Sequence, residues 1–270
     1  MSPSFPANAL ARFKPTELFR QAGVIGALMM REISTRFGRE GLGFAWLVLE
    51  PLAFCIGVII LWSATKPAYE HGIRVAAFTM TGYMCVVLFR HQIMYSVSAL
   101  QANIGLLHHR QVKPLHIFLS RNLLEFAGAT IAFIVVYIAI FGLGQIELPR
   151  DYLLVYLGWM LLGWNGMGLA MVMAGLAMRF EVLERVIQLI TYILIPLSGA
   201  FSMVAWVPPH LQQAYLFLPL PHCIEMLRAG VFGEFVVTHY DPYYALAWGT
   251  SLNILGFLLV AGARDLLDVE

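Results

Sequence analysis

Charged residues are scarce in this chain. Only 12% of its 270 residues are Asp, Glu, Lys or Arg, against roughly 25% in a soluble globular domain. Hydrophobic residues make up 60% of the chain, and the mean hydropathy is +0.75. This composition predicts a chain solvated mainly by lipid, and the net charge of +1 gives no support to nucleic-acid binding.

Several kinds of chemical site are missing as well. Cys55, Cys85 and Cys223 stand singly, without the spacing of a zinc site or the density of a disulfide framework. The adjacent His108 and His109 lack a nearby Asp, Glu or Cys that would complete a metal site. No Gly-Lys pair occurs, so the chain lacks the phosphate-binding loop that would hold ATP. We therefore expect no catalytic residue, metal or cofactor in this chain.

Long apolar segments dominate what is present. A helix that crosses about 30 Å of hydrocarbon needs about 20 mostly apolar residues. Six segments meet this requirement, at 42–64, 75–98, 116–143, 152–178, 186–205 and 243–263. The sequence therefore predicts an all-α membrane protein with six transmembrane helices, which form one membrane domain over residues 42–270.

Proline interrupts the apolar stretch between the fifth and sixth segments. Residues 206–235 are too broken for another crossing, because proline removes a hydrogen-bond donor and kinks a helix. The interruptions are Pro208, Pro209, Pro219, Pro221 and Gly230. We predict two short helices that enter the bilayer only part way, as a re-entrant hairpin between helices five and six.

Lysine and arginine are distributed unevenly between the predicted loops. If the N-terminus is cytoplasmic, twelve of these residues lie on that side and only Lys66, Arg74, Arg150 and Arg228 on the other. The positive-inside rule then places both termini in the cytoplasm and the hairpin on the periplasmic side. No stretch before Leu42 fits a secretory signal peptide, so we expect the N-terminal segment to be retained.

An amphipathic helix is predicted before the first crossing, within residues 1–41. From Thr16 to Arg36 the apolar residues fall on one stripe, which suits a helix lying in the membrane interface. The arginines Arg31, Arg36 and Arg39 form a cluster just before the first crossing. Two interpretations remain: a plain membrane anchor, or a collar that receives an anionic lipid head group or docks on a soluble partner.

Two charges lie inside predicted crossings. Glu50 and Arg90 each sit about eight residues from the cytoplasmic end of their segments, roughly 12 Å deep. Intramembrane charges are costly unless paired or facing water, so we predict a Glu50–Arg90 ion pair or a polar vestibule containing both. The alternative is that Arg90 reaches the head groups on its own. We expect no other ionisable side chain to be buried in the crossings, which disfavours an ion-coupled carrier.

Two predicted cytoplasmic loops have the composition of docking elements. The loop between the second and third crossings is basic, carries two leucines and ends at proline, which suits a short helix that binds another protein. Its expected contact residues are Asn103, Leu106, Leu107, Arg110, Lys113 and Pro114. The loop between the fourth and fifth crossings adds Glu181 and Arg185.

Small and aromatic residues occupy the fourth and fifth crossings. Gly166, Ala170 and Ala174 recur at every fourth position, which predicts close helix packing. The aromatic and amide side chains either line a path on which sugars stack or are ordinary membrane packing. The candidates for such a lining are Trp159, Trp164, Asn165, Tyr192 and Phe201.

The run from Arg31 to Pro51, REISTRFGREGLGFAWLVLEP, carries a recognisable pattern. It resembles the start of the first crossing in polysaccharide-export ABC permeases of the type-2 exporter class, most closely those for capsular polysaccharide. The segment RQVKPL and the stretch PLPHCIEMLR, from Pro219 to Arg228, also look like the coupling loop and outward gate helices of that family. The positions that carry the first resemblance are Arg36, Phe37, Leu42, Gly43, Trp46 and Pro51.

This resemblance implies a homodimer of the chain joined to two ATP-binding subunits, which would hold the ATP and magnesium. It implies that the chain lies in the bacterial inner membrane and that its 103–114 loop docks on the ATPase. The implied substrate is a lipid-linked glycan, passed on to a periplasmic adaptor and an outer-membrane pore. The residues implied at the cytoplasmic entrance for the substrate and at the membrane interface are Arg31, Arg36, Arg39, Trp46, Glu50 and Arg90. The implied outward gate contains Pro219, His222, Glu225 and Arg228.

Three other interpretations stay open at the level of sequence. Within the same class, the chain could be a permease for O-antigen or teichoic acid, or a type-2 exporter of drugs or lipids. From a different class, His222 and Glu225 are the only pointers to an intramembrane lipid-modifying enzyme. Activity that requires a separate ATPase would exclude the enzyme.

Overall fold

The computed structural model consists almost entirely of helices. It describes residues 15–37, 43–65, 69–70, 72–99, 101–107, 112–233 and 237–262. The helical class that the sequence predicts is confirmed. In chain order the elements are α1 (Pro15–Phe37), α2 (Gly43–Thr65), β1 (Tyr69–Glu70), β2 (Ile73–Arg74), α3 (Val75–Val97), η1 (Gln101–Asn103), α4 (Ile104–Leu107), α5 (Pro114–Gly142), α6 (Tyr152–Ala177), α7 (Glu181–Leu197), η2 (Val204–Trp206), α8 (Pro209–Leu216), α9 (Pro219–Phe232) and α10 (Pro242–Ala261).

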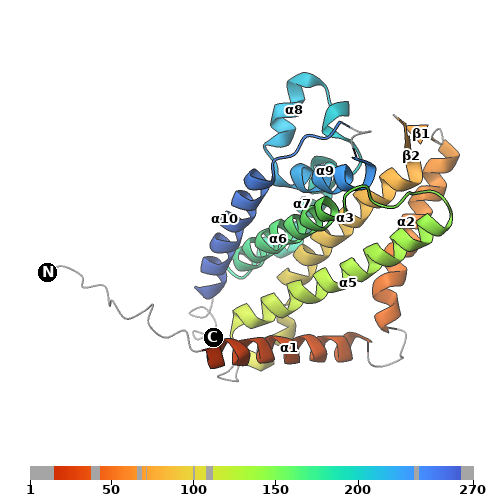
Figure 1. Ribbon diagram of the computed structural model, residues 1–270. Helices are drawn as coiled ribbons and strands as arrows, with labels where there is room; N and C mark the ends of the chain where they lie inside the picture. The colour runs from red at the N-terminus through yellow and green to blue at the C-terminus, as the bar shows by residue number, and fades with distance from the viewer. Residues whose placement is uncertain are drawn as a thin grey trace.

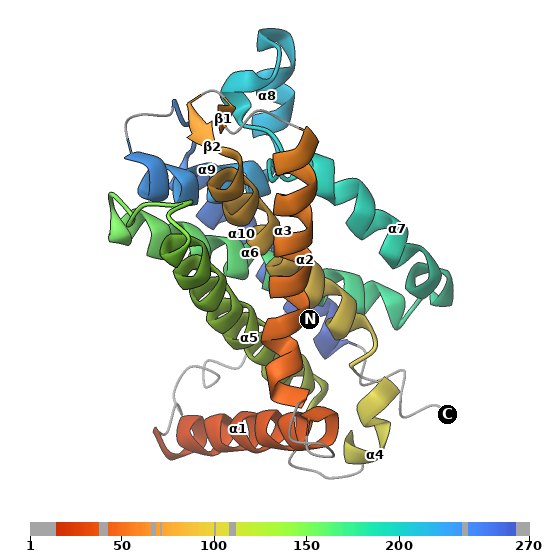
Figure 2. The ribbon, with the colours of Figure 1, turned by 90° about the vertical axis from the view of Figure 1, so that its right-hand side faces the viewer.

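The long helices form a bundle with different elements at its two ends. α2, α3, α5, α6 and α10 make up its body, and α1 lies across one end, as Figure 1 shows. α8, α9 and the antiparallel ribbon of β1 and β2 lie at the opposite end. In the turned view of Figure 2, α7 leans away from the bundle. The two ends are named here the α1 end and the α9 end.

α3 and α6 form the centre of the bundle. Most α3 side chains are buried, and Met84, Leu88 and Phe89 are completely enclosed. α6 packs against α3, α9 and α10. Within the described residues, α5, α6 and α10 are long and apolar enough to cross a membrane, and shorter apolar runs lie at Pro51–Trp62 of α2 and Arg185–Leu197 of α7.

Small residues let α6 approach its neighbours closely. A Cβ atom on Gly166 would lie 2.1 Å from Oε1 of Gln92 on α3, so a larger residue would need that side chain to move. Ala170 and Ala174 are fully or almost fully buried in the same helix. The stripe of small residues predicted from the sequence is therefore confirmed as helix packing.

Helix starts coincide with residues that favour them. Asp151 and Asp241 cap α6 and α10, and each carboxylate accepts two backbone N–H groups at 2.8 to 3.0 Å. Proline lies in the first turn of α5, α8, α9 and α10, including Pro219 of α9. The backbone N–H groups of a first turn have no partner within the helix, so the missing N–H of proline costs no hydrogen bond. These signals are local, so predicted and observed starts agree within two residues for every apolar helix except α7.

α7 differs from the prediction at both ends. The expected fifth crossing covers residues 186–205, whereas α7 begins at Glu181 and ends at Leu197. Pro196 lies in its last turn, and Gly199 has a positive φ of 88°, a conformation that glycine adopts without strain. The chain therefore turns before residue 205. Residues 206–235 do contain the two short helices that their prolines predict, α8 and α9.

Candidate functional site

A cavity of about 570 Å³ opens between α2, α3 and α7, and we name it the α3–α7 cavity. Phe54 of α2 stacks on Tyr83 of α3 at its wall, with the ring centroids 4.7 Å apart. Arg90 and His91 of α3 also line it and supply a cation and an ionisable ring. Aromatic rings beside a cation suit a ligand that carries both sugars and anionic groups.

Arg90 is held at this cavity by an aromatic ring. Its guanidinium carbon lies 4.5 Å from the ring centroid of Tyr192 on α7, which is a cation–π contact. Arg90 is only partly buried, so its charge stays within reach of a ligand. The side chain of Glu50 lies outside the described part of the structure, and the Glu50–Arg90 ion pair therefore stays a prediction.

A line of charged side chains runs from α1 into the bundle beside this cavity. Arg121 of α5 donates a hydrogen bond to Glu32 of α1. Arg121 Nε lies 3.8 Å from Oε1 of Glu125, and Oε2 of Glu125 lies 3.7 Å from Nδ1 of His91. The Arg121 guanidinium also stacks on Tyr95, 5.0 Å from the ring centroid. Glu32, Arg121, Glu125 and His91 are named here the Glu32–His91 network.

The centre of this network is deeply buried. The Glu125 side chain is completely enclosed and Arg121 exposes 10% of its side chain, whereas Glu32 and His91 expose 22% and 23%. The prediction that no ionisable side chain besides Glu50 and Arg90 is buried in the apolar segments is therefore wrong. Arg121 and Glu125 stand one helical turn apart, a spacing that is visible in the sequence. The long apolar segment around them hid the fact that the two side chains form a buried pair.

Two further polar contacts fasten α1 to the bundle. Arg31 donates to Oδ1 of Asn103 at 2.8 Å, and Gln21 bonds to the ring of His116 at the start of α5. The sequence placed Arg31 in the membrane interface and Asn103 in the docking loop. The structure brings these two predicted sites into direct contact.

The rest of the predicted docking and interface residues are described only in part. Leu106 is half-buried, Lys113 is exposed and Pro114 begins α5. In the second loop Arg185 is exposed. Outside the described residues or side chains lie Leu107, Arg110 and Glu181, together with Arg36, Arg39 and Trp46.

The five predicted lining residues lie in different places. Tyr192 is exposed beneath Arg90, and Phe201 is exposed after the end of α7. Trp159 and Asn165 are buried, and they donate hydrogen bonds to α5 and α10 respectively. Trp164 is partly exposed and bonds to α10. None of the five is among the described residues that line the α3–α7 cavity, but Tyr192 contacts Arg90 of its wall.

At the α9 end, Arg228 is the centre of a buried hydrogen-bond cluster. Its fully enclosed guanidinium donates to the carbonyl oxygens of Gly199, Ala200 and Ser202 at 2.7, 2.5 and 3.3 Å. Its Cζ atom also lies 4.0 Å from the ring centroid of Phe78 on α3. Arg228 therefore fixes the turn after α7 against both α9 and α3.

Glu225 and His222 hold further backbone segments against α9. The Glu225 carboxylate accepts two backbone N–H groups, at 3.0 Å from His239 and 3.3 Å from the start of η2. Burial raises the pKa of this carboxyl group, and the hydrogen bond from the His239 N–H opposes that rise. His222 Nδ1 accepts the N–H of Asp241 at 2.8 Å. The two side chains that pointed to a lipid-modifying enzyme thus bind backbone groups.

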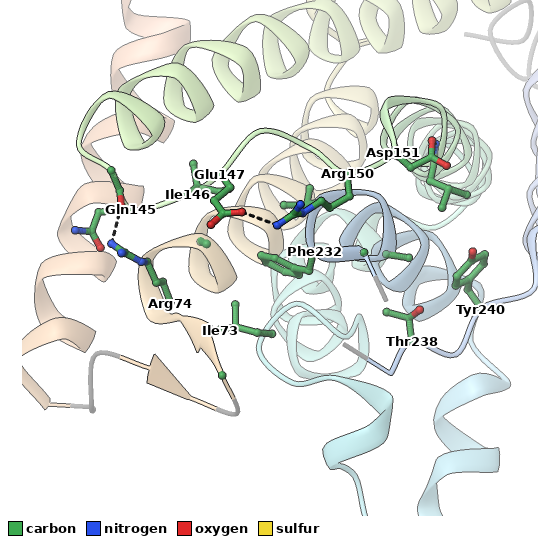
Figure 3. Close-up of a pocket in the computed structure, with 17 residues that line it drawn as sticks. Ile73, Arg74, Gln145, Ile146, Glu147, Arg150, Asp151, Phe232, Thr238 and Tyr240 are labelled. Atoms are coloured by element: carbon green, nitrogen blue, oxygen red, sulfur yellow. Dashed lines mark hydrogen bonds and ion pairs between the residues drawn. The ribbon is translucent and has the colours of Figure 1, made fainter. Parts of the chain in front are cut away.

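A larger cavity, of about 980 Å³, lies at the α9 end and is shown in Figure 3. Two arginines line it, and both are already engaged. Arg74 donates to the carbonyl oxygen of Gly144 at 2.6 Å, and Arg150 pairs with Glu147 at 2.8 Å. Two carboxylates, those of Glu147 and Asp151, also line this cavity and balance the charges of the two arginines, which disfavours an anionic ligand. The α3–α7 cavity is the better candidate for a functional site.

The bundle consists of apolar helices, and a partly polar cavity and buried charges lie between them. This arrangement is typical of a membrane transport protein. Residues 23–232 match the family described as ABC-2 type transporter, and the chain belongs to that family.

Several known proteins resemble the chain over nearly its whole length. It is 38% identical over 244 residues to the capsule polysaccharide export inner-membrane protein CtrC of Neisseria meningitidis, covering 90% of this chain and 92% of that protein. It is 34% identical to the capsule polysaccharide export inner-membrane protein BexB of Haemophilus influenzae, covering 89% and 91% of the two chains. It is 27% identical to the polysialic acid transport protein KpsM of Escherichia coli, covering 89% and 90%.

Proposed function

We propose that this chain is the permease subunit of an ATP-driven exporter that moves lipid-linked capsular polysaccharide across the bacterial inner membrane. The observation that carries this proposal is the similarity, over about nine-tenths of the chain, to proteins named for capsule polysaccharide export. A separate subunit would bind and hydrolyse ATP, because this chain has no phosphate-binding loop.

In this proposal α2, α3, α5, α6, α7 and α10 cross the membrane, and α1 lies in its cytoplasmic interface. α8 and α9 form a hairpin that enters the bilayer part way from the periplasmic side. The uneven distribution of lysine and arginine supports this orientation, with both termini in the cytoplasm. The α1 end is then cytoplasmic and the α9 end periplasmic.

In the proposed homodimer, the second copy would pack against the apolar faces that α2 and α7 expose. Ile60 and Leu61 of α2 expose 64% and 60% of their surface, and Leu189 and Ile193 of α7 expose 60% and 52%. Both helices border the α3–α7 cavity. A second copy packed against these faces would place two such cavities along one shared path between the subunits.

The ATPase is proposed to dock at η1 and α4, beside Asn103. Arg31 binds Asn103, so α1 would lie next to the same docking site. On the far side of the membrane, a periplasmic adaptor and an outer-membrane pore would receive the glycan at the α9 end.

The anionic, sugar-bearing head of the substrate is proposed to contact the α3–α7 cavity. Arg90 would bind an anionic group, because a guanidinium forms strong charge-assisted hydrogen bonds with phosphate and carboxylate. The stacked rings of Phe54 and Tyr83 would offer an apolar face to a sugar ring.

Deletion of the gene tests the transport proposal directly. We expect the deletion strain to lose surface capsule and to accumulate glycan in the cytoplasm, with a lipid at its reducing end. A plasmid copy of the gene should restore the surface glycan. Normal surface glycan in the deletion strain, measured by antibody binding and sugar analysis, would rule the proposal out.

Cysteine labelling tests the orientation. The native Cys55, Cys85 and Cys223 are buried, so a maleimide should hardly react with them. In spheroplasts, a membrane-impermeant maleimide is expected to label Glu147→Cys in the exposed loop between α5 and α6, but not Ser34→Cys on α1. After permeabilisation both should react, and the chain without an added cysteine is the control. Labelling of Ser34→Cys in sealed spheroplasts would contradict the proposed orientation.

A further inference from the structure

Stability alone is a poor explanation for the Glu32–His91 network. Replacing a buried ion pair by apolar residues of similar size is often neutral or stabilising, because taking charges out of water costs more than their attraction returns. Glu125 is completely enclosed, in a helix that is otherwise apolar enough to cross a membrane. A role in transport explains why such a network is present at this position.

The two ends of the network lie on different parts of the molecule. Glu32 belongs to α1, which lies across the α1 end in Figures 1 and 2. His91 lines the wall of the α3–α7 cavity, next to Arg90. Arg121 and Glu125 of α5 stand between them, so three helices are linked by one line of ionisable side chains.

The inner links of the network are electrostatic: Arg121 and Glu125 form a charge pair, and Glu125 attracts the His91 ring when that ring is protonated. Separations of 3.7 Å from Glu125 to His91 and 3.8 Å from Arg121 to Glu125 are too long for hydrogen bonds. Coulombic attraction falls off gradually with distance and is strong where water is excluded. Such contacts can keep the helices connected while the helices shift relative to each other.

We propose that Arg121 and Glu125 are positioning residues, which tie His91 on the cavity wall to Glu32 on α1. A displacement of α1 is then transmitted to the surface that the substrate contacts. α1 is also bound to the docking loop by the Arg31–Asn103 hydrogen bond, so movement of a partner at that loop displaces α1. This inference rests on the proposed function and names the route by which ATP hydrolysis reaches the cavity.

The test uses the complete exporter, with its ATPase, reconstituted in lipid vesicles. Glu32→Gln and Glu125→Gln each remove one charge while keeping the size of the side chain. ATP hydrolysis and glycan export are measured together for each variant and for the double variant. We expect each single change to lower the glycan exported per ATP hydrolysed by about 5-fold or more, the lower end of typical coupling between sites.

The double variant separates a serial link from two independent roles. In a serial link, either single change already interrupts the connection. The double variant should therefore export no less glycan per ATP than the worse single variant. Independent structural effects would instead multiply. Glu147→Gln is the matched control, because its carboxylate lies in an exposed ion pair at the α9 end and should leave the ratio unchanged.

Two outcomes would overturn the inference: an unchanged ratio in folded single variants, or losses that multiply in the double variant. If Glu125→Gln fails to fold, Glu32→Gln and His91→Gln provide the same comparison, because both side chains are partly exposed and each change removes one link of the network. Failure of the wild-type complex to export glycan at all would instead count against the proposed function.

Discussion

Replacing Arg228 by methionine is expected to lower the free energy of unfolding by about 3–5 kcal/mol, because each buried acceptor that loses its donor costs about 1–3 kcal/mol. The change leaves the carbonyl oxygens of Gly199, Ala200 and Ser202 without their donor inside the protein. Methionine fills a similar volume but offers no hydrogen. We therefore expect the turn after α7 to separate from α9 and the protein to accumulate poorly in the membrane.

Thermal unfolding of the detergent-purified protein, followed by its loss of monodispersity, measures this effect. Arg150→Met is the matched control: the same side chains are exchanged at the same end of the molecule, but Arg150 is exposed and paired with the exposed Glu147. Its expected cost is about 0–1 kcal/mol. Equal melting temperatures for the two variants would show that the Arg228 cluster does not hold the α9 end together.

Replacing Arg90 by glutamate is expected to reduce glycan export at least about 10-fold, as a loss of one charge-assisted contact plus a like-charge repulsion requires. The substitution puts a negative charge on the wall of the α3–α7 cavity, where an anionic substrate would bind. Arg90 is only partly buried, so the protein should still fold. Surface glycan and membrane abundance of the permease, measured in the same cells, separate these effects.

Three companion variants locate the cause. Arg90→Lys keeps the charge but loses the planar contact with Tyr192, so export should fall only in part. Tyr192→Phe keeps the ring under the guanidinium and should export normally. Combining Glu50→Arg with Arg90→Glu should restore part of the export if the two residues form the predicted ion pair. Full export by Arg90→Glu alone would remove the cavity from the substrate path.

The apolar helices could be predicted because their signals lie in consecutive residues. Apolar length alone located the starts of most helices within two residues. The structure adds that Asp151, Asp241 and several prolines lie at these starts, and these signals are local as well. α7 was misplaced because the apolar composition continues past its end, while the chain turns at Gly199. The resemblance around residues 31–51 indicated the family that the chain then proved to match.

The candidate site was predicted less well, because its residues come from separate helices. Arg90 and Tyr192 were both named from the sequence, but no pattern indicated that one lies over the other. Glu125 was overlooked because a single carboxylate hardly changes the hydropathy of a long apolar segment. Trp159 and Asn165 were grouped with Tyr192 by residue type, whereas the structure buries them where α6 packs against α5 and α10.

By itself the sequence determined that this protein is helical and apolar, and where most of its helices begin. These properties follow from the order and hydropathy of neighbouring residues. Only the tertiary structure decided which face of α3 meets the cavity, because that helix is buried on nearly every side and has no polar stripe to orient it. The structure also decided that Glu32 meets Arg121, 89 positions away, because helix packing rather than spacing brings such residues together.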